Sequence, residues 1–224
     1  MTPRDTTETL IKICGLRDAS SALHAATCGA DFIGLNFVPA SPRYVDRDTA
    51  ATIANELRKQ TQRCRSVGLF VDASVASMVE MVSSLKLDVL QLHGHEDVAV
   101  VAKAKRSLPP TTQLWRALPF DITQIDAWRN NRDIDALLID APYVSGELTG
   151  GTGRTLDWDA LRSLDRDGLP PIMLAGGLTP DNVAEAIRVV RPWGVDVSSG
   201  VESSRGVKDL QKMKAFCDAV RNAE

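Results

Sequence analysis

The stretch Leu10-Ile11-Lys12-Ile13-Cys14-Gly15 is a short apolar segment that ends in a cysteine and a glycine. Its apolar, largely β-branched residues before a glycine predict a strand. Because alternate side chains of a strand share a face, Lys12 and Cys14 point one way and Ile11 and Ile13 the other. A cation two residues from a thiol favours the thiolate. Cys14 is therefore a candidate reactive group at the carboxyl end of a strand, with an inert buried thiol as the alternative.

Segments of this kind recur along the chain and alternate with amphipathic helical stretches. The predicted strands are Leu10–Cys14, Phe32–Phe37, Ser66–Val71, Val89–His93, Gln113–Leu118, Ala136–Asp140, Pro171–Ala175 and Val195–Ser199. The predicted helices are Asp18–Thr27, Asp46–Gln60, Ser74–Leu85, Asp97–Leu108, Ile122–Arg129, Asp157–Leu164, Pro180–Arg191 and Val207–Arg221. The predicted N-caps are Asp18, Asp46, Ser74, Thr123 and Thr179, with Pro180 at the first helical position.

Strict alternation of strands and helices predicts parallel strands with helices on the outside. Eight such units in 224 residues fit a single-domain (β/α)8 TIM barrel spanning residues 1–224, with a flexible N-terminal extension over residues 1–9. A doubly wound open sheet is the alternative, but it would more often have fewer strands and a central switch point. No shift in composition divides the chain into domains.

The amino-acid composition limits the classes of binding partner that we expect for the protein. The net charge of -3 gives no basic field for nucleic acid or for an anionic membrane. No apolar run is long enough to span a bilayer, and residues 1–8 lack the apolar core of a signal peptide, so we expect a cytoplasmic protein. The remaining cysteines (Cys28, Cys64 and Cys217) show no metal-ligand spacing and are expected to pack as small hydrophobic residues.

In a (β/α)8 barrel the functional groups sit at the carboxyl ends of the strands. After the second strand, two prolines hold Arg43, whose planar fork suits a carboxylate or phosphate; a solvated loop arginine is the alternative. Asp140 ends the sixth strand after a purely apolar run, which predicts a raised pKa and a carboxyl group able to donate a proton. A capping or loop-anchoring aspartate is the alternative there.

The fourth and fifth strands carry further polar groups. Gln91 and His93 share a face of the fourth strand, and His93 is predicted to line a pocket, whereas His95 is expected in solvent. No third or fourth ligand accompanies the two histidines at a recognisable spacing, so no metal site is expected. Arg116 lies inside the fifth strand, where a structural ion pair and an anion contact are equally plausible.

Glycine-rich loops follow the sixth, seventh and eighth strands, at Gly150–Thr155, Ala175–Thr179 and Ser198–Glu202. Glycine lets backbone N–H groups approach a ligand closely, and phosphate sites of this fold recur after strands seven and eight. With one thiol, one carboxyl group and one or two arginines, the predicted mouth suits proton transfer on a small phosphorylated substrate that carries a second anionic group. No dinucleotide fingerprint is evident in the sequence.

These residues together resemble the phosphoribosylanthranilate isomerase family of the tryptophan pathway. The resemblance covers nearly the whole chain and rests on seven short segments in order. They are Lys12–Gly15, Gly34–Phe37 with Ser41–Val45, Val67–Val71, Leu90–Gly94, Gly150–Gly153, Leu174–Leu178 and Val195–Glu202.

The resemblance implies an Amadori rearrangement that converts N-(5-phosphoribosyl)anthranilate to 1-(2-carboxyphenylamino)-1-deoxyribulose 5-phosphate without a cofactor. It implies that Asp140 is the general acid that opens the ribose ring and that Cys14 is the general base that removes the C2 proton. By the same resemblance, Arg43 faces the anthranilate carboxylate, Asp196 lies near the sugar and His93 contacts the substrate. The implied phosphate-binding residues are Gly153, Gly177, Ser199 and Gly200. The sequence leaves the assembly open between a monomer and a homodimer.

Three other readings compete. A sister sugar isomerase of histidine biosynthesis catalyses the same rearrangement but places an aspartate where this chain has Cys14. Indoleglycerol-phosphate synthase would need a lysine acid and a glutamate base at strand ends, a pair we do not find. A phosphate-binding scaffold barrel would leave Cys14 and Asp140 without a task. The family's isomerase activity therefore fits the strand ends best.

Overall fold

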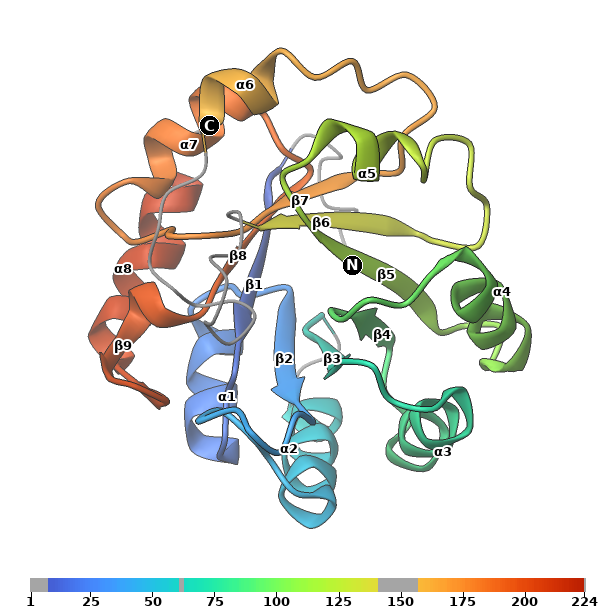
Figure 1. The fold of residues 1–224 in the computed structure, drawn as a ribbon. Helices are drawn as coiled ribbons and strands as arrows, with labels where there is room; N and C mark the ends of the chain where they lie inside the picture. Colours follow the sequence, from blue (N-terminus) through green and yellow to red (C-terminus); the bar gives the residue numbers. More distant parts are fainter. Residues whose placement is uncertain (1–7, 61–62, 141–156, 224) are drawn as a thin grey trace.

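Eight parallel strands close into a barrel, as the alternation of the sequence predicts. The structure is a computed structural model that describes residues 8–60, 63–140 and 157–223. Each strand pairs with the next along the chain, and the eighth pairs with the first (Figure 1). The strands are β1 (Leu10–Cys14), β2 (Phe32–Asn36), β3 (Arg65–Phe70), β4 (Val89–Leu92), β5 (Gln113–Pro119), β6 (Ala136–Asp140), β7 (Ile172–Leu174) and β8 (Gly194–Val197).

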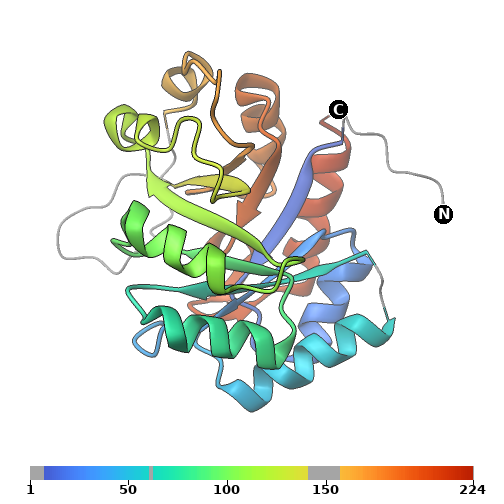
Figure 2. The same ribbon diagram turned by 90° about the vertical axis from the view of Figure 1, so that its right-hand side faces the viewer.

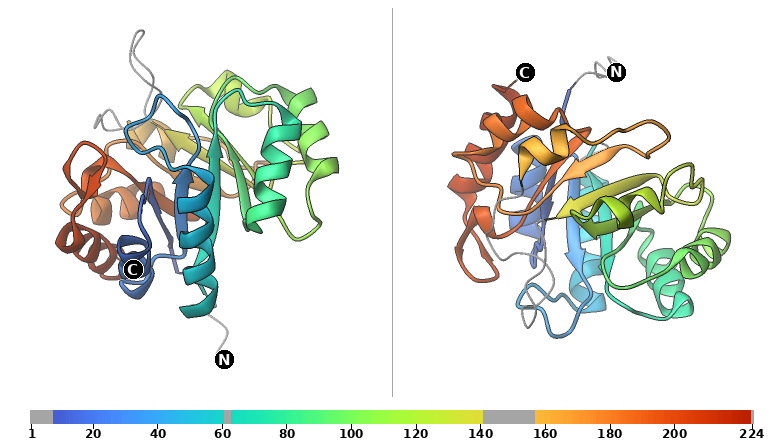
Figure 3. Two further views of the ribbon diagram at one scale, coloured as in Figure 1. Left: turned by 90° about the horizontal axis from the view of Figure 1, so that it is seen from below. Right: turned by 45° about the horizontal axis from the view of Figure 1, so that its top comes forward.

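Helices surround the barrel on its outer side in every view (Figures 1 and 3). They are α1 (Ala19–Thr27), α2 (Arg47–Gln60), α3 (Val75–Leu85), α4 (Val98–Ser107), α5 (Ile122–Asp126), α6 (Trp158–Arg162), α7 (Val183–Val190) and α8 (Leu210–Arg221). Among the described residues, none of these helices has both the length and the apolar character that crossing a membrane requires.

The alternation of side chains along each strand creates two apolar layers. Ile11 and Ile13 point outward from β1 and pack in the large core beneath the helices. Phe32, Val67 and Trp115 point inward from their strands and form a second core inside the barrel. Because side chains fill the barrel interior, the mouth of the barrel is the expected place for a ligand.

The first and last parts of the chain close the barrel together. Helix α8 lies beside β1 (Figure 2), and Arg221 Nη1 donates a 2.7 Å hydrogen bond to the carbonyl oxygen of Thr9. Thr9 is itself buried. Thr9, which we assigned to a flexible extension over residues 1–9, thus belongs to the packed barrel, and residues 1–7 lie outside the described part of the chain.

Three predicted N-caps are confirmed by their side-chain hydrogen bonds. Asp18, Asp46 and Ser74 each accept a hydrogen bond from the backbone N–H three residues later, at 2.8, 2.7 and 3.2 Å. This bond satisfies a donor that the first helical turn leaves unpaired. Short polar side chains before an amphipathic run therefore identified the starts of α1, α2 and α3 correctly.

Two predicted assignments at helix starts are wrong, although α5 begins at Ile122 as predicted. Asp121, and not Thr123, caps α5 with its side chain, because a helix beginning at Ile122 needs its cap one residue earlier. Helix α7 begins only at Val183, so Pro180 does not occupy the first helical position. A turn separates Pro180 from the helix, and there the Asn182 side chain accepts a 2.8 Å hydrogen bond from the backbone N–H of Thr179.

The segment after β8 differs most from the prediction. We predicted a helix from Val207, but a two-stranded antiparallel hairpin precedes α8, with β9 (Glu202–Ser204) and β10 (Val207–Lys208). Gly206 turns the hairpin with a φ of 82°, a conformation that favours glycine. Helix α8 then begins at Leu210. The hairpin brings Glu202 and Lys208 back to the mouth of the barrel.

Candidate active site

One cavity at the carboxyl ends of the strands collects most of the predicted site residues. Cys14 from β1, Asp140 from β6 and Asp196 from β8 line it. Arg43 from the loop after β2 and His93 from the end of β4 line the same cavity. The closed barrel thus brings together five predicted residues from distant parts of the sequence, the first being Cys14 and the last Asp196.

The Cys14 thiol occupies space that its neighbouring strand leaves open. Gly34 of β2 lies opposite Cys14 in the register of the sheet. A Cβ atom at Gly34 would lie 2.7 Å from Cys14 Sγ and 2.9 Å from Cys14 Cα, too close for any side chain. The Ser198 hydroxyl donates a 3.1 Å hydrogen bond to the carbonyl oxygen of Cys14. The thiol is therefore held at the mouth by packing on one side and by a backbone anchor on the other.

The electrostatic surroundings of Cys14 bear on its protonation state, which the sequence left open. Burial raises the pKa of the Cys14 thiol above its ordinary value, and this is the largest influence. The Lys12 ammonium opposes burial and lowers the pKa, as Lys208 does from another side, whereas Asp196 raises it. Burial outweighs the two cations, so the thiol form predominates at neutral pH.

Lys12 and Asp196 form a buried ion pair beneath the thiol. The two residues face each other in the register between β1 and β8, and Lys12 Nζ lies 2.9 Å from Asp196 Oδ1. Lys12 is fully buried, yet its pKa is raised, because the attraction of Asp196 and of Cys14 together exceeds the effect of burial. The pair keeps a positive charge close to Cys14.

His93 connects the fourth strand to the carboxylate of Asp140. Its Nδ1 lies 2.9 Å from the side-chain nitrogen of Gln91, and its Nε2 lies 3.6 Å from Asp140 Oδ2. Both His93 and Asp140 are buried. Gln91 thus fixes the orientation of the imidazole, and the imidazole forms the cavity wall beside Asp140. His95 lies outside the cavity, exposed, with its Nδ1 3.0 Å from Asp72 Oδ2.

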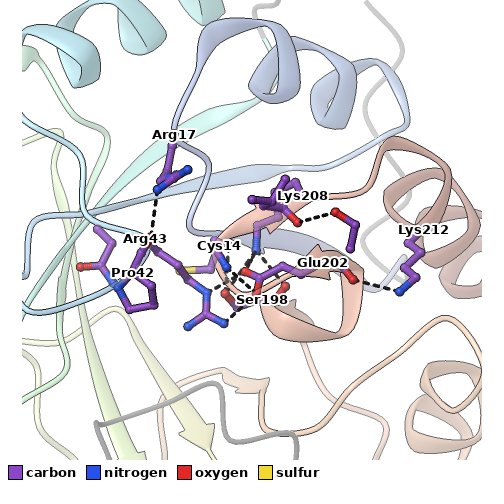
Figure 4. A network of polar contacts seen from close by, with 12 residues as sticks. Cys14, Arg17, Pro42, Arg43, Ser198, Glu202, Lys208 and Lys212 are labelled. Atoms are coloured by element: carbon purple, nitrogen blue, oxygen red, sulfur yellow. Dashed lines mark hydrogen bonds and ion pairs between the residues drawn. The ribbon is translucent and has the colours of Figure 1, made fainter.

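Arg43 forms an internal ion pair at the edge of the cavity (Figure 4). Its Nε and Nη2 donate to the two carboxylate oxygens of Glu202 at 2.7 and 3.0 Å. Lys208 Nζ donates to Glu202 Oε1 at 2.9 Å and to the carbonyl oxygen of Ser198 at 2.8 Å. These hydrogen bonds to Arg43 and Lys208 hold the pKa of Glu202 at about 2. Arg43 is therefore not the solvated loop arginine that we considered.

Arg116 is a structural residue, which decides between the two alternatives that the sequence left open. Its Nη1 lies 3.2 Å from Glu96 Oε2, and both side chains are buried. Arg116 also donates to the carbonyl oxygens of Leu92, Gly94 and Ala117. These bonds fix the loop after β4, and with it the position of His93.

Replacing Arg116 by leucine is expected to lower the free energy of unfolding by about 3 kcal/mol, because it leaves the buried Glu96 carboxylate without its cation. Urea unfolding followed by circular dichroism measures the loss. The double variant Arg116→Leu with Glu96→Gln is expected to recover part of it, since no buried charge is then left unpaired. An Arg116→Leu protein as stable as the wild type would contradict a structural role.

Three of the four predicted phosphate-binding residues, namely Gly177, Ser199 and Gly200, lie elsewhere at the mouth. A Cβ atom at Gly200 would lie within 2 Å of the Leu178 carbonyl oxygen, so the loops after β7 and β8 touch at a position that only glycine fits. Gly177 lies in the loop after β7 and has a φ of 66°. In the loop after β8, Ser199 begins the short 3-10 turn that contains Gly200. Gly177, Ser199 and Gly200 are thus neighbours, although they do not line the cavity of Cys14. Gly153 lies outside the described residues.

Several residues at the mouth of the barrel were not predicted as site residues from the sequence. Asn36, Ser198 and Arg205 line the cavity, and Glu202 and Lys208 hold Arg43 and Ser198. Glu202 belongs to a quoted segment, but nothing in the sequence pairs it with an arginine 159 positions away. The Arg205-Gly206 turn signal was the one indication that a hairpin, and not a helix, occupies this segment.

A buried thiol and a buried carboxyl group in one cavity at the mouth of a (β/α)8 barrel define an enzyme-type site for acid–base chemistry. The model of the family "N-(5'phosphoribosyl)anthranilate (PRA) isomerase" matches residues 11–219. The chain belongs to this family. It is an isomerase of tryptophan biosynthesis that interconverts an aldose and a ketose.

Individual relatives agree with the family match. The N-(5'-phosphoribosyl)anthranilate isomerase of Sinorhizobium fredii is 42% identical over 217 residues, which cover 96% of this chain and 94% of the relative. A crystal structure of phosphoribosyl anthranilate isomerase with reduced 1-(o-carboxyphenylamino)-1-deoxyribulose 5-phosphate is 31% identical, with a TM-score of 0.80 over 96% of this chain and 99% of the other. A structure of monomers generated from the dimeric Thermotoga maritima enzyme is 32% identical, with the same TM-score and coverage.

Proposed function

We propose that the chain converts N-(5-phosphoribosyl)anthranilate to 1-(2-carboxyphenylamino)-1-deoxyribulose 5-phosphate by an Amadori rearrangement, with Asp140 as general acid and Cys14 as general base. The observation that carries this proposal is that Cys14 and Asp140, which end β1 and β6, line one cavity. A proton donor and a proton acceptor that share one cavity can act on neighbouring atoms of one substrate.

The first step of the proposed mechanism opens the sugar ring. The Asp140 carboxyl group donates its proton to the ribose ring oxygen, and the bond between C1 and that oxygen breaks. The lone pair of the anthranilate nitrogen forms a double bond to C1, which gives a protonated Schiff base. His93, with Nε2 3.6 Å from Asp140 Oδ2, contributes the polar wall against which Asp140 is oriented. The substrate supplies its own electron sink, so the mechanism needs no cofactor.

The second step removes the carbon-bound proton. The Cys14 thiolate takes the proton from C2, and the electron pair forms a C1–C2 double bond while the Schiff base nitrogen becomes neutral. The resulting enolamine then tautomerises to the ketone. Lys12 and Lys208 both favour the thiolate form of Cys14, which offsets part of the cost of burial. The step therefore draws on a thiol whose deprotonation the two lysines assist.

The remaining site residues are proposed to bind the substrate. Arg43 faces the anthranilate carboxylate from the edge of the cavity, and Asp196, whose side chain lines the cavity, lies near the sugar. His93 contacts the substrate from the cavity wall. For the phosphate we propose the glycine loops, with Gly153, Gly177, Ser199 and Gly200. The relative with a bound product analogue holds a ligand with the same phosphate and carboxylate groups.

Domain organisation, assembly and location complete the proposal. We propose one (β/α)8 barrel for the whole chain, as a monomer or a homodimer; the Thermotoga maritima relative is dimeric. We place the enzyme in the cytoplasm, because its proposed base must stay reduced and all four cysteines are free thiols.

An activity assay on the wild-type protein is expected to show turnover of freshly made N-(5-phosphoribosyl)anthranilate. Loss of the substrate's fluorescence provides the measurement. The aminoaldose phosphate of histidine biosynthesis serves as the comparison substrate, and we expect little or no turnover of it. Equal or faster turnover of that substrate would move the function to the sister isomerase.

A further inference from the structure

The hairpin β9–β10 is fixed to the loop that carries Arg43. Glu202 Oε2 accepts a 3.0 Å hydrogen bond from the backbone N–H of Gly206, and the same carboxylate binds Arg43. Gly206 packs so closely on Pro42 that an added Cβ atom would lie 2.6 Å from the Pro42 carbonyl oxygen. The residue that precedes Gly206 is therefore held next to the Arg43 loop by one buried carboxylate and one backbone contact.

That residue is Arg205, and its guanidinium has no partner among the described residues. Its side chain is exposed, yet it lines the same cavity as Cys14 and Asp140. Arg43 is the other arginine among the described residues that line the cavity. Its Nε and Nη2 already donate hydrogen bonds to Glu202. Of the two arginines among the described residues that line the cavity, Arg205 is consequently the one that can bind an anion without first breaking an internal ion pair.

The charges at the cavity edge favour an incoming anion. Glu202 is ionised, since its pKa is about 2, and Arg43 and Lys208 together exceed its charge by one. Arg205 adds a further positive charge on the solvent side. An arginine fork suits a carboxylate, because two parallel N–H donors match its two oxygens.

We propose that Arg205 is a second carboxylate-binding residue, which contacts the aromatic carboxylate of the substrate from the hairpin while Arg43 contacts it from the neighbouring loop. This inference rests on the proposed function, because it takes the anthranilate carboxylate as the group recognised. Glu202 is then a positioning residue: it sets the distance between the two arginines by binding Arg43 and the hairpin turn together.

Calorimetric titration with two stable ligands tests the proposal. The first is reduced 1-(o-carboxyphenylamino)-1-deoxyribulose 5-phosphate, and the second is its phenylamino counterpart, which lacks the carboxylate. For Arg205→Gln we expect Kd of the first ligand to rise roughly 5-fold, the effect of one exposed charge contact, and Kd of the second to stay unchanged. Arg106→Gln is the matched control, because Arg106 is exposed at the end of α4 and does not line the cavity.

The outcomes separate the inference from the function on which it rests. An equal loss of affinity for both ligands would overturn carboxylate recognition. It would mean that Arg205 contacts the phosphate or attracts any anion through the electrostatic field of the mouth. Unchanged affinity for both ligands would remove Arg205 from the site. A wild-type protein that binds neither ligand would overturn the proposed function itself, and the assignment of Arg205 with it.

Discussion

Replacing Cys14 by alanine is expected to lower kcat about 1,000-fold, the typical contribution of a positioned acid–base group. The alanine side chain cannot take the C2 proton, whereas every group that binds the substrate stays in place. KM should therefore change little, and kcat and kcat/KM should fall together. Steady-state kinetics with freshly made phosphoribosylanthranilate provide the measurement. Undiminished kcat in this variant would remove Cys14 from the mechanism.

Cys64→Ala is the matched control for Cys14→Ala. Cys64 is also a buried thiol, and it directly precedes β3, so it lies at the opposite end of the barrel from the cavity. Burial raises its pKa to about 12. We expect kcat of this variant to equal that of the wild type, while its stability falls modestly because a buried side chain is shortened. Equal losses of kcat in both variants would indicate general damage to the fold.

The sequence predicted the barrel because its strands repeat one local pattern. Buried parallel strands such as Ala136–Asp140 read as continuous apolar runs, and glycine directly follows several of the predicted strands. The direction in which Cys14 and Asp140 face then follows from alternation along a strand and from the barrel rule. These properties depend on local sequence and on topology, so a single sequence is enough to predict them.

The contacts of Arg43 show what local patterns do not contain. Its partner Glu202 lies beyond six intervening strands, in a hairpin whose second strand we read as the start of a helix. Helical spacing within Val207–Arg221 outweighed the Arg205-Gly206 turn signal at its beginning. The sequence left the protonation state of Cys14 open for a related reason. Lys12 is visible in the sequence, but the burial that outweighs it depends on how strands and loops pack around the thiol.

Replacing Asp140 by asparagine is expected to lower kcat about 100- to 1,000-fold, because an amide of the same shape cannot protonate the ring oxygen. Asp167→Asn is the matched control, since Asp167 is exposed and does not line the cavity. A 100-fold loss in the control, or no loss in Asp140→Asn, would contradict the role of Asp140 as general acid.

The Asp140→Asn variant also isolates the titration of the base. In the wild type, a carboxyl group that must be protonated and a thiol that must be ionised impose opposite pH requirements, so the profile reports the pair. In the variant only Cys14 remains. Its pKa is raised above the ordinary 9.0, so the thiolate fraction grows about tenfold per pH unit between about pH 6 and 8. We therefore expect log kcat/KM of the residual activity to rise with a slope near one throughout this range.

A profile that levels off below pH 8 would mean that Lys12 and Lys208 overcome burial and hold Cys14 as a thiolate in the free enzyme. The result would correct the balance of charges around Cys14 without removing it as the base. A flat profile that persists in the double variant Asp140→Asn with Cys14→Ala would show that the residual activity does not pass through the thiol. The pH dependence thus tests the identity of the base independently of the loss in kcat.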